Sequence, residues 1–287
     1  MWIGWERDIK FLKNIEFRLP GKREWATLSN GREVSLYEDN LKANLTLPFR
    51  TFERELLHRL GLAPSQLNPN AWHVIIGLQV LWKVVHGVDI DLTVDELLYC
   101  YKLSKITASP GVKGLTFRSK LLRLIPDLPK SNRYWKPRYF FLCGDNWVFS
   151  PGEVVKSSSR WIRRTWGLPP STGGCSSLSS TLLMSSISVF FLFSNSLFLA
   201  AFLKPHLREW LLQRITEVAN HLGKCLTFLL SPRSLAKCSL GLEPSEVVKK
   251  FWRWTNEVSL TTNNGLFTFI FKNFSYLSKS SNFFFYG

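Results

Sequence analysis

The stretch between Asn68 and Gly87 constrains the fold more than any other part of this sequence. Asn68 is a favourable helix N-cap, Pro69 suits the first helical turn, and Gly87 supplies a C-terminal stop. Apolar residues occupy most of the intervening surface: Trp72, Val74, Ile75, Ile76, Leu78, Leu81, Trp82 and Val85. A helix that is apolar on most sides is buried on most sides. We therefore expect it at the centre of a globular core, with four residues inside that core: Trp72, Ile76, Leu81 and Trp82.

Two shorter helices flank this central one. Thr51 is a fair N-cap and Gly61 a stop, which predicts a helix over 51–60. Thr93 and Glu96 have the spacing of a capping box and predict the start of another helix. The apolar positions that follow these starts are Phe52, Leu56 and Leu60 in the first, and Leu97, Leu98, Tyr101 and Leu103 in the second.

The pattern changes after Pro110 to short apolar runs that Gly and Pro interrupt, which is typical of strands. Tyr139–Cys143 and Trp147–Phe149 flank a Gly-Asp-Asn turn, so we predict a hairpin there. Helices followed by short antiparallel strands indicate an α+β fold. Residues 30–150 are expected to fold as an independent α+β domain.

The composition changes at Leu168. Residues 1–168 hold 26 basic and 16 acidic side chains, net +10, whereas residues 169–287 hold 11 and 5, net +6. The later part is rich in Ser and Phe, and we expect it to be poorly ordered or to contain one hydrophobic helix. This divides the chain into an N-terminal extension at 1–29, a domain at 30–168, and the Ser/Phe-rich region at 169–287.

Thr181–Leu203 contains no charged residue over 23 positions. As a helix it would span about 34 Å, which is enough to cross a bilayer. Three interpretations stay open: a single membrane span, a buried helix, or a translated pyrimidine-rich non-coding tract such as a retained intron. The first would place the protein in a membrane, and the other two are compatible with the cytoplasm or nucleus.

The net charge of +16 favours an anionic partner. Basic and aromatic residues alternate in two segments, where phosphate contacts could combine with base stacking. The predicted nucleic-acid contacts are Lys130, Arg133, Trp135, Lys136, Arg138, Arg163 and Arg164. The alternative interpretation is a solvated loop whose rings anchor it to the core.

One motif could indicate an enzyme. Asp89, Asp91 and Thr93 match the Asp-x-Asp-x-Thr pattern of magnesium-dependent, haloacid-dehalogenase-like phosphatases, in which the first Asp is the nucleophile. That pattern requires a preceding strand, whereas residues 71–86 indicate a helix. Asp91 and Asp95 are better explained as charges near the start of the next helix.

Metal and cofactor sites lack sequence support. The chain has neither Cys-x-x-Cys nor His-Glu-x-x-His, and no glycine-rich phosphate-binding loop. His58, His73 and His86 are expected to be ordinary packed or surface histidines. We infer no cofactor, no metal and no small-molecule substrate.

A family resemblance rests on nine short segments in a fixed order. They are Phe17-Arg-Leu-Pro20, Leu36-Tyr-Glu-Asp39, Leu47-Pro-Phe49, Glu55-Leu-Leu-His-Arg-Leu-Gly-Leu-Ala-Pro64, Gln66-Leu-Asn-Pro-Asn-Ala-Trp72, Asp95-Glu-Leu-Leu-Tyr99, Ser131-Asn-Arg-Tyr-Trp-Lys136, Arg138-Tyr-Phe-Phe141 and Arg164-Thr-Trp-Gly167. Through them, residues 15–168 resemble the gypsy-type transposon domain family of plants, which occurs in retrotransposon-derived reading frames.

The resemblance implies a non-enzymatic, gag-like protein that self-associates and contacts nucleic acid, with no catalytic residue to carry over. The chain departs from a complete element, because no Cys-x-x-Cys-x4-His-x4-Cys zinc knuckle and no polymerase, integrase or protease motif follows. We therefore expect a fragment of such an element.

Overall fold

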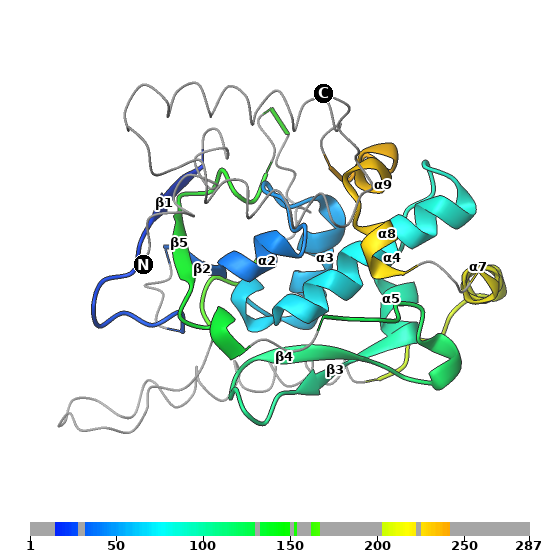
Figure 1. Cartoon of the computed structure of the whole chain (residues 1–287), viewed down its shortest axis with the longest axis horizontal. Helices are drawn as coiled ribbons and strands as arrows, with labels where there is room; N and C mark the ends of the chain where they lie inside the picture. The colour runs from blue at the N-terminus through cyan, green and yellow to red at the C-terminus, as the bar shows by residue number, and fades with distance from the viewer. Residues whose placement is uncertain are drawn as a thin grey trace, which may run out of the picture. The chain divides into compact units, whose positions relative to one another are not determined.

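A computed structural model shows an α+β fold, as the sequence predicts (Figure 1). The residues that it describes are 15–27, 32–129, 133–149, 152–153, 162–166, 203–221 and 225–241. They belong to two units, 1–226 and 227–287. The elements are β1 (Glu16–Arg18), β2 (Val34–Tyr37), α2 (Glu38–Lys42), α3 (Thr51–Leu60), η1 (Pro64–Gln66), α4 (Pro69–His86), α5 (Val94–Cys100), β3 (Tyr101–Lys105), β4 (Lys113–Phe117), η2 (Lys120–Leu122), η3 (Arg133–Trp135), β5 (Tyr139–Cys143), α7 (Glu209–Asn220), α8 (Leu226–Leu229) and α9 (Pro232–Lys237).

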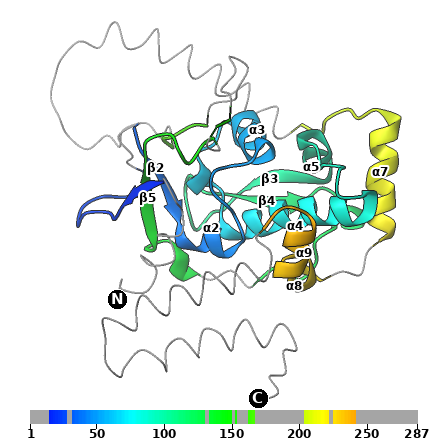
Figure 2. The same ribbon diagram turned by 90° about the horizontal axis from the view of Figure 1, so that it is seen from above.

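Helix α4 is the centre of the first unit, where it contacts α2, β4 and α7 (Figure 2). It begins as predicted, because the Asn68 side chain accepts a hydrogen bond from the Ala71 backbone N–H at 2.8 Å. It ends before Gly87, whose φ of 103° is easily reached by glycine. Its four expected core residues are no more than 3% exposed: Trp72, Ile76, Leu81 and Trp82.

The flanking helices also follow their local signals. Helix α3 has the predicted bounds, and Gly61 closes it in the left-handed conformation at φ 62°. The cap of α3 is Arg50, so Thr51 is the first helical residue rather than the cap. Thr93 and Glu96 form the predicted capping box at the start of α5.

The predicted hairpin between Tyr139–Cys143 and Trp147–Phe149 is wrong. The first segment is β5, but it is the middle strand of an antiparallel sheet with the order β1-β5-β2. The second segment packs near α3 instead: Phe49 N donates to Trp147 O at 3.0 Å, and Arg54 Nη1 donates to Val148 O at 2.9 Å. Four of the five β5 residues are buried, as suits a central strand with partners on both edges.

A second sheet is a hairpin of β3 and β4, in which Leu103 pairs with Leu115 and Lys105 with Lys113. The sequence pattern predicts that the apolar residues Tyr101 and Leu103 continue the helix that begins after Thr93. The helix stops at Cys100 instead, because Tyr101 and Leu103 alternate with exposed or half-exposed residues at the period of a strand. Backbone hydrogen bonding ties this hairpin to α4, since Asn68 N donates to Lys113 O at 3.0 Å.

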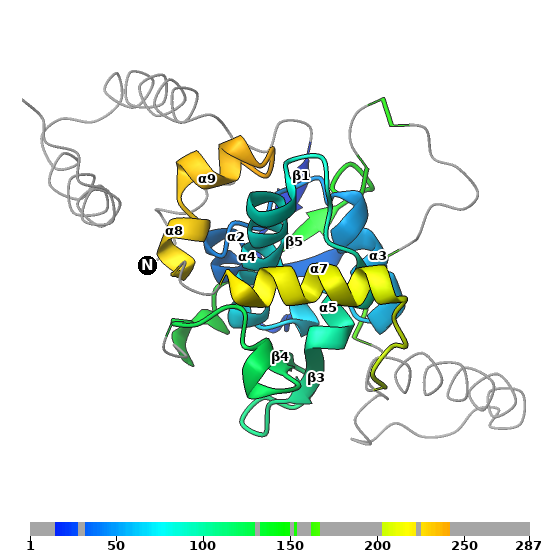
Figure 3. The same cartoon turned by 90° about the vertical axis from the view of Figure 1, so that its right-hand side faces the viewer.

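Helix α7 packs against α4 although it follows residue 168 (Figure 3). Arg214 Nε lies 3.3 Å from Glu96 Oε1, and Arg214 Nη2 donates to Asp91 O at 2.8 Å. His86 Nδ1 lies 3.3 Å from Glu217 Oε2. The first unit therefore includes an element from the Ser/Phe-rich part of the chain.

Of the described elements, α9 lies entirely within the second unit. Ser231 caps α9 by accepting a hydrogen bond from Ser234 N at 3.3 Å, and Pro232 occupies the first turn. In the described ranges, no helix is both long enough and apolar enough to cross a membrane. Apart from Leu203, the uncharged segment Thr181–Leu203 lies outside those ranges.

Candidate nucleic-acid interface

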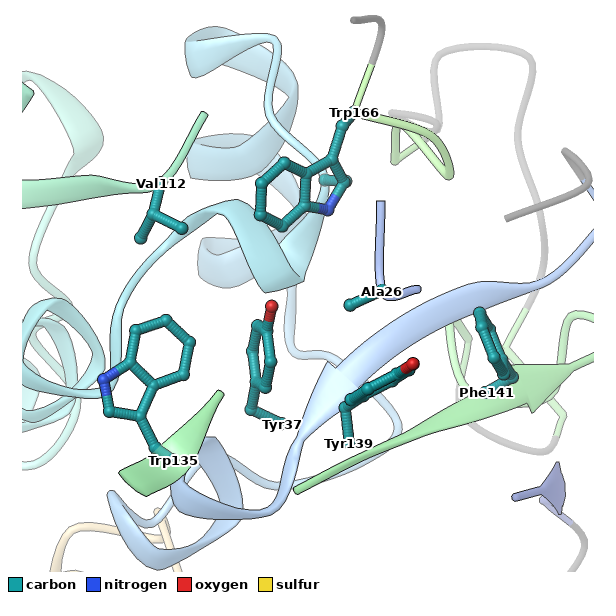
Figure 4. Packing of buried hydrophobic residues seen from close by; sticks show 8 residues of the cluster. Ala26, Tyr37, Val112, Trp135, Tyr139, Phe141 and Trp166 are labelled. Carbon is teal, nitrogen blue, oxygen red and sulfur yellow. The ribbon is translucent and has the colours of Figure 1, made fainter. Parts of the chain in front are cut away.

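Trp135 was predicted to stack on a base, but its ring is 7% exposed. It meets Tyr37 edge to face, with ring centroids 4.5 Å apart (Figure 4). Such contacts favour packing over solvent exposure. Trp135 therefore follows the alternative interpretation, in which the ring anchors its segment to the core.

The ring belongs to an aromatic cluster that joins β2, β5, η3 and several loops (Figure 4). Its members are Ala26, Tyr37, Ala63, Val112, Trp135, Tyr139, Phe141 and Trp166. Burial raises the pKa of the Tyr37 phenol above its ordinary value, so this hydroxyl stays protonated at physiological pH. The cluster holds η3 against the connection between β3 and β4, because Val112 and the adjoining Ile106 pack with it.

Arg138 is engaged in an ion-pair network with the first turn of α2. Its Nη2 donates to Asp39 Oδ1 at 3.1 Å, and its Nε lies 3.6 Å from Glu38 Oε2. The Glu38 backbone N–H also donates to Arg138 O at 3.0 Å. A phosphate at Arg138 would have to compete with two carboxylates.

The two arginines before Trp166 are also engaged. Arg163 Nη1 donates to Gly61 O at 3.2 Å, and burial lowers the pKa of its guanidinium. Arg164 pairs with Asp145, donates to Arg32 O at 2.5 Å, and lies over the Trp147 ring at 5.3 Å. These contacts tie the segment 162–166 to the rest of the first unit.

Lys136 is different, because its side chain is exposed. Its Nζ donates to Ala108 O at 3.0 Å, in the connection between β3 and β4. Of the predicted contacts, Lys130 lies outside the described residues, and so does the side chain of Arg133. Lys136 is thus a predicted nucleic-acid contact that is exposed and lies at the tip of the β3–β4 hairpin.

The hairpin itself carries basic residues outside the predicted nucleic-acid contacts. Lys105 and Lys113 are directly opposite each other across β3 and β4, so their side chains leave the same face. Burial, together with the neighbouring Lys105, lowers the pKa of Lys113. We call Lys105, Lys113 and Lys136 the lysine group.

A signal for this group was present in the sequence. Residues 101–126 carry six basic residues and no acidic one. The nucleic-acid prediction rests on basic residues that alternate with aromatic rings, and the hairpin lacks that pattern. Lys105 and Lys113 come together through the pairing of β3 with β4, which no local sequence pattern displays.

The phosphatase motif does not have its required setting. Asp89 and Asp91 are exposed in the loop that follows α4, rather than at the end of a strand. Asp91 pairs with Lys83 at 2.7 Å, and Asp95 in the first turn of α5 pairs with Arg59 at 2.8 Å. Both carboxylates act as charges near the start of α5, as the sequence indicated.

The three histidines considered above lie in ordinary positions. His58 is exposed, while burial lowers the pKa values of His73 and His86. His73 Nδ1 lies 2.9 Å from Pro69 O within its own helix. Among the described residues, no three His, Cys, Asp or Glu side chains gather as metal ligands would.

No family model, curated protein or solved structure matches this chain. The resemblance to the gypsy-type transposon domain family, and the function that it implies, stay predictions.

Proposed function

We propose that this chain is a non-enzymatic, gag-like protein of retrotransposon origin that contacts nucleic acid through the lysine group. The origin and the self-association that accompanies it rest on the resemblance of residues 15–168. The contact surface rests on a separate observation, the juxtaposition of Lys105 and Lys113 on one face of the β3–β4 hairpin.

Like charges opposite each other on adjacent strands destabilise the pairing. Burial, followed by the charge of Lys105, lowers the pKa of Lys113. A bound phosphate would stabilise both ammonium groups and remove the repulsion. Lys136 Nζ donates to Ala108 O in the connection between β3 and β4, which adds a third basic residue at the tip of the same hairpin.

Fluorescence anisotropy of the full chain with a labelled single-stranded RNA tests this proposal across a range of salt concentrations. Each phosphate contact contributes about −0.7 to the slope of log affinity against log salt for single strands. The double variant Lys105→Gln and Lys113→Gln should therefore bind more weakly, with a slope shallower by about 1.4.

Lys22→Gln combined with Arg23→Gln is the matched control. Both residues are exposed in the loop after β1, and the double change removes the same charge. It should leave the slope close to that of the unaltered chain. Equal slopes for the two double variants, with thermal melts showing that both are folded, would contradict the assignment to the hairpin, as would absence of binding at about 50 mM salt.

A further inference from the structure

We propose that the loop after β1 is a second contact surface of this chain, which binds anionic lipid bilayers by burying the Trp25 ring among the head groups. The loop, residues 19–25, projects from the three-stranded sheet (Figure 1 and Figure 2). Trp25 is 66% exposed, and its neighbours Lys22 and Arg23 are exposed as well. The proposal goes beyond the nucleic-acid contact and does not rest on it, because the lysine group lies on other elements.

The single acidic residue of this loop, Glu24, is bound back to β1. Its Oε2 accepts hydrogen bonds from Arg18 Nη1 and from the Gly21 backbone N–H, both at 2.7 Å. These bonds lower the pKa of Glu24 to about 2, so the carboxylate stays ionised beside Arg18 at physiological pH. Lys22 and Arg23 are left as the exposed charges of the loop.

Hydrogen bonds from the core also hold the backbone on both sides of Trp25. The Tyr139 hydroxyl donates to Glu24 O at 2.6 Å, and Ser35 Oγ donates to Ala26 O at 2.6 Å. Ala26 is itself buried in the aromatic cluster. The ring of Trp25 is therefore presented to solvent from a fixed backbone, so little conformational entropy is lost when the ring is buried by a partner.

The chemistry of the loop fits a bilayer surface. Tryptophan is favoured at the membrane–water interface, because its ring is apolar and its indole N–H is polar. Lysine and arginine beside it are attracted to anionic head groups. A projecting loop with one ring and two cations offers much less area than the roughly 800 Å² that each partner contributes to a stable protein interface. Shallow insertion into a bilayer requires no such area.

The test measures co-sedimentation of the full chain with vesicles of phosphatidylcholine alone or mixed with phosphatidylserine. The unaltered chain should prefer the mixed vesicles. Lys22→Gln combined with Arg23→Gln should weaken that binding by about fivefold for each charge. Trp25→Ala should weaken it by about 10- to 100-fold, because the apolar ring is no longer buried.

A fluorescence measurement separates insertion of the ring from attraction of the whole basic chain. Brominated lipid in the mixed vesicles should quench part of the tryptophan emission. Trp25→Phe should abolish this quenching while it retains most of the binding, since phenylalanine keeps an apolar ring at the same position.

Two variants on other elements are matched controls. Trp210, at 53% exposed on α7, is a second exposed indole, so Trp210→Ala should leave vesicle binding and quenching unchanged. Lys102→Gln combined with Lys120→Gln removes the same charge as the loop variant from two other exposed positions. It should weaken binding much less, because the attraction to head groups falls off within a Debye length.

Equal losses in the loop variants and their controls would overturn the proposal, because the net charge alone would then explain the binding. Quenching that persists in Trp25→Phe, or absence of binding to the mixed vesicles, would overturn it too. Loop variants that weaken RNA binding and leave vesicle binding unchanged would assign the loop to nucleic acid instead. The lysine variants Lys105→Gln and Lys113→Gln test the nucleic-acid contact separately, so either proposal can fail alone.

Discussion

Glu96 joins four groups although its side chain is completely buried. Its Oε2 accepts hydrogen bonds from the backbone N–H and the hydroxyl of Thr93, both at 2.8 Å. Its Oε1 accepts a hydrogen bond from Trp82 Nε1 at 3.3 Å and lies 3.3 Å from Arg214 Nε. One carboxylate therefore caps α5 and links it to α4 and α7.

Removing this carboxylate should destabilise the fold strongly. Glu96→Ala leaves the Trp82 indole N–H without its acceptor and Arg214 without its ion-pair partner, and breaking a buried ion pair costs about 3–5 kcal/mol. Asp95→Ala is the control one residue earlier, because its pair with Arg59 is partly exposed and such pairs contribute about 0–1 kcal/mol. Urea denaturation of both variants measures the difference. Similar free energies of unfolding would show that Glu96 is not a structural link.

The sequence does not predict which individual aromatic residues are exposed. Tyr134 and Trp135 are adjacent, and both lie in a basic segment, so no local pattern distinguishes them. Trp135 is buried because its ring packs edge to face with Tyr37, which is distant in sequence, within the aromatic cluster. Which of the two rings is exposed depends on tertiary packing.

Among the elements, the helices could be predicted well and the strands poorly. Caps such as Asn68 and stops such as Gly61 act on backbone groups a few residues away, so the sequence displays them directly. Strand β5 instead pairs with β1 and β2, which lie about a hundred residues earlier in the chain. A short-range turn pattern suggested a nearer partner, Trp147–Phe149, because the distant strands leave no local signal.

The end of α3 provides an element-scale prediction. Gly61 has a φ of 62°, and an added Cβ would meet nothing within 4 Å. The cost of Gly61→Ala is therefore conformational, about 1–2 kcal/mol for a residue with a Cβ in the left-handed region. Gly61→Asn should cost less, because asparagine visits this region more readily. Thermal unfolding compares the two, and equal stability of Gly61→Ala and the unaltered chain would contradict the argument.

At the scale of the whole molecule, the first unit draws on segments outside residues 30–150. Strand β1 forms one edge of the three-stranded sheet, and Trp166 lies in the aromatic cluster. The Trp166 indole N–H donates to Ser65 Oγ at 2.8 Å, and that hydroxyl lies 2.7 Å from Ser35 Oγ. The sequence suggested most of the elements of this unit, but the β1–β5 pairing and the Trp166–Ser65 hydrogen bond join residues more than 100 positions apart.

The thermal stabilities of two fragments of different length test whether β1 and Trp166 belong to the cooperative core. A fragment of residues 15–166 should unfold cooperatively at a higher temperature than the fragment 30–150. The shorter one lacks the β1 edge and Trp166, and removing a buried tryptophan side chain typically costs about 3–5 kcal/mol. Circular dichroism during heating measures both midpoints, and Trp166→Ala in the longer fragment separates the ring from the strand. If Trp166→Ala, the unaltered 15–166 fragment and the 30–150 fragment share the same melting temperature, then β1 and Trp166 are not part of the cooperative core.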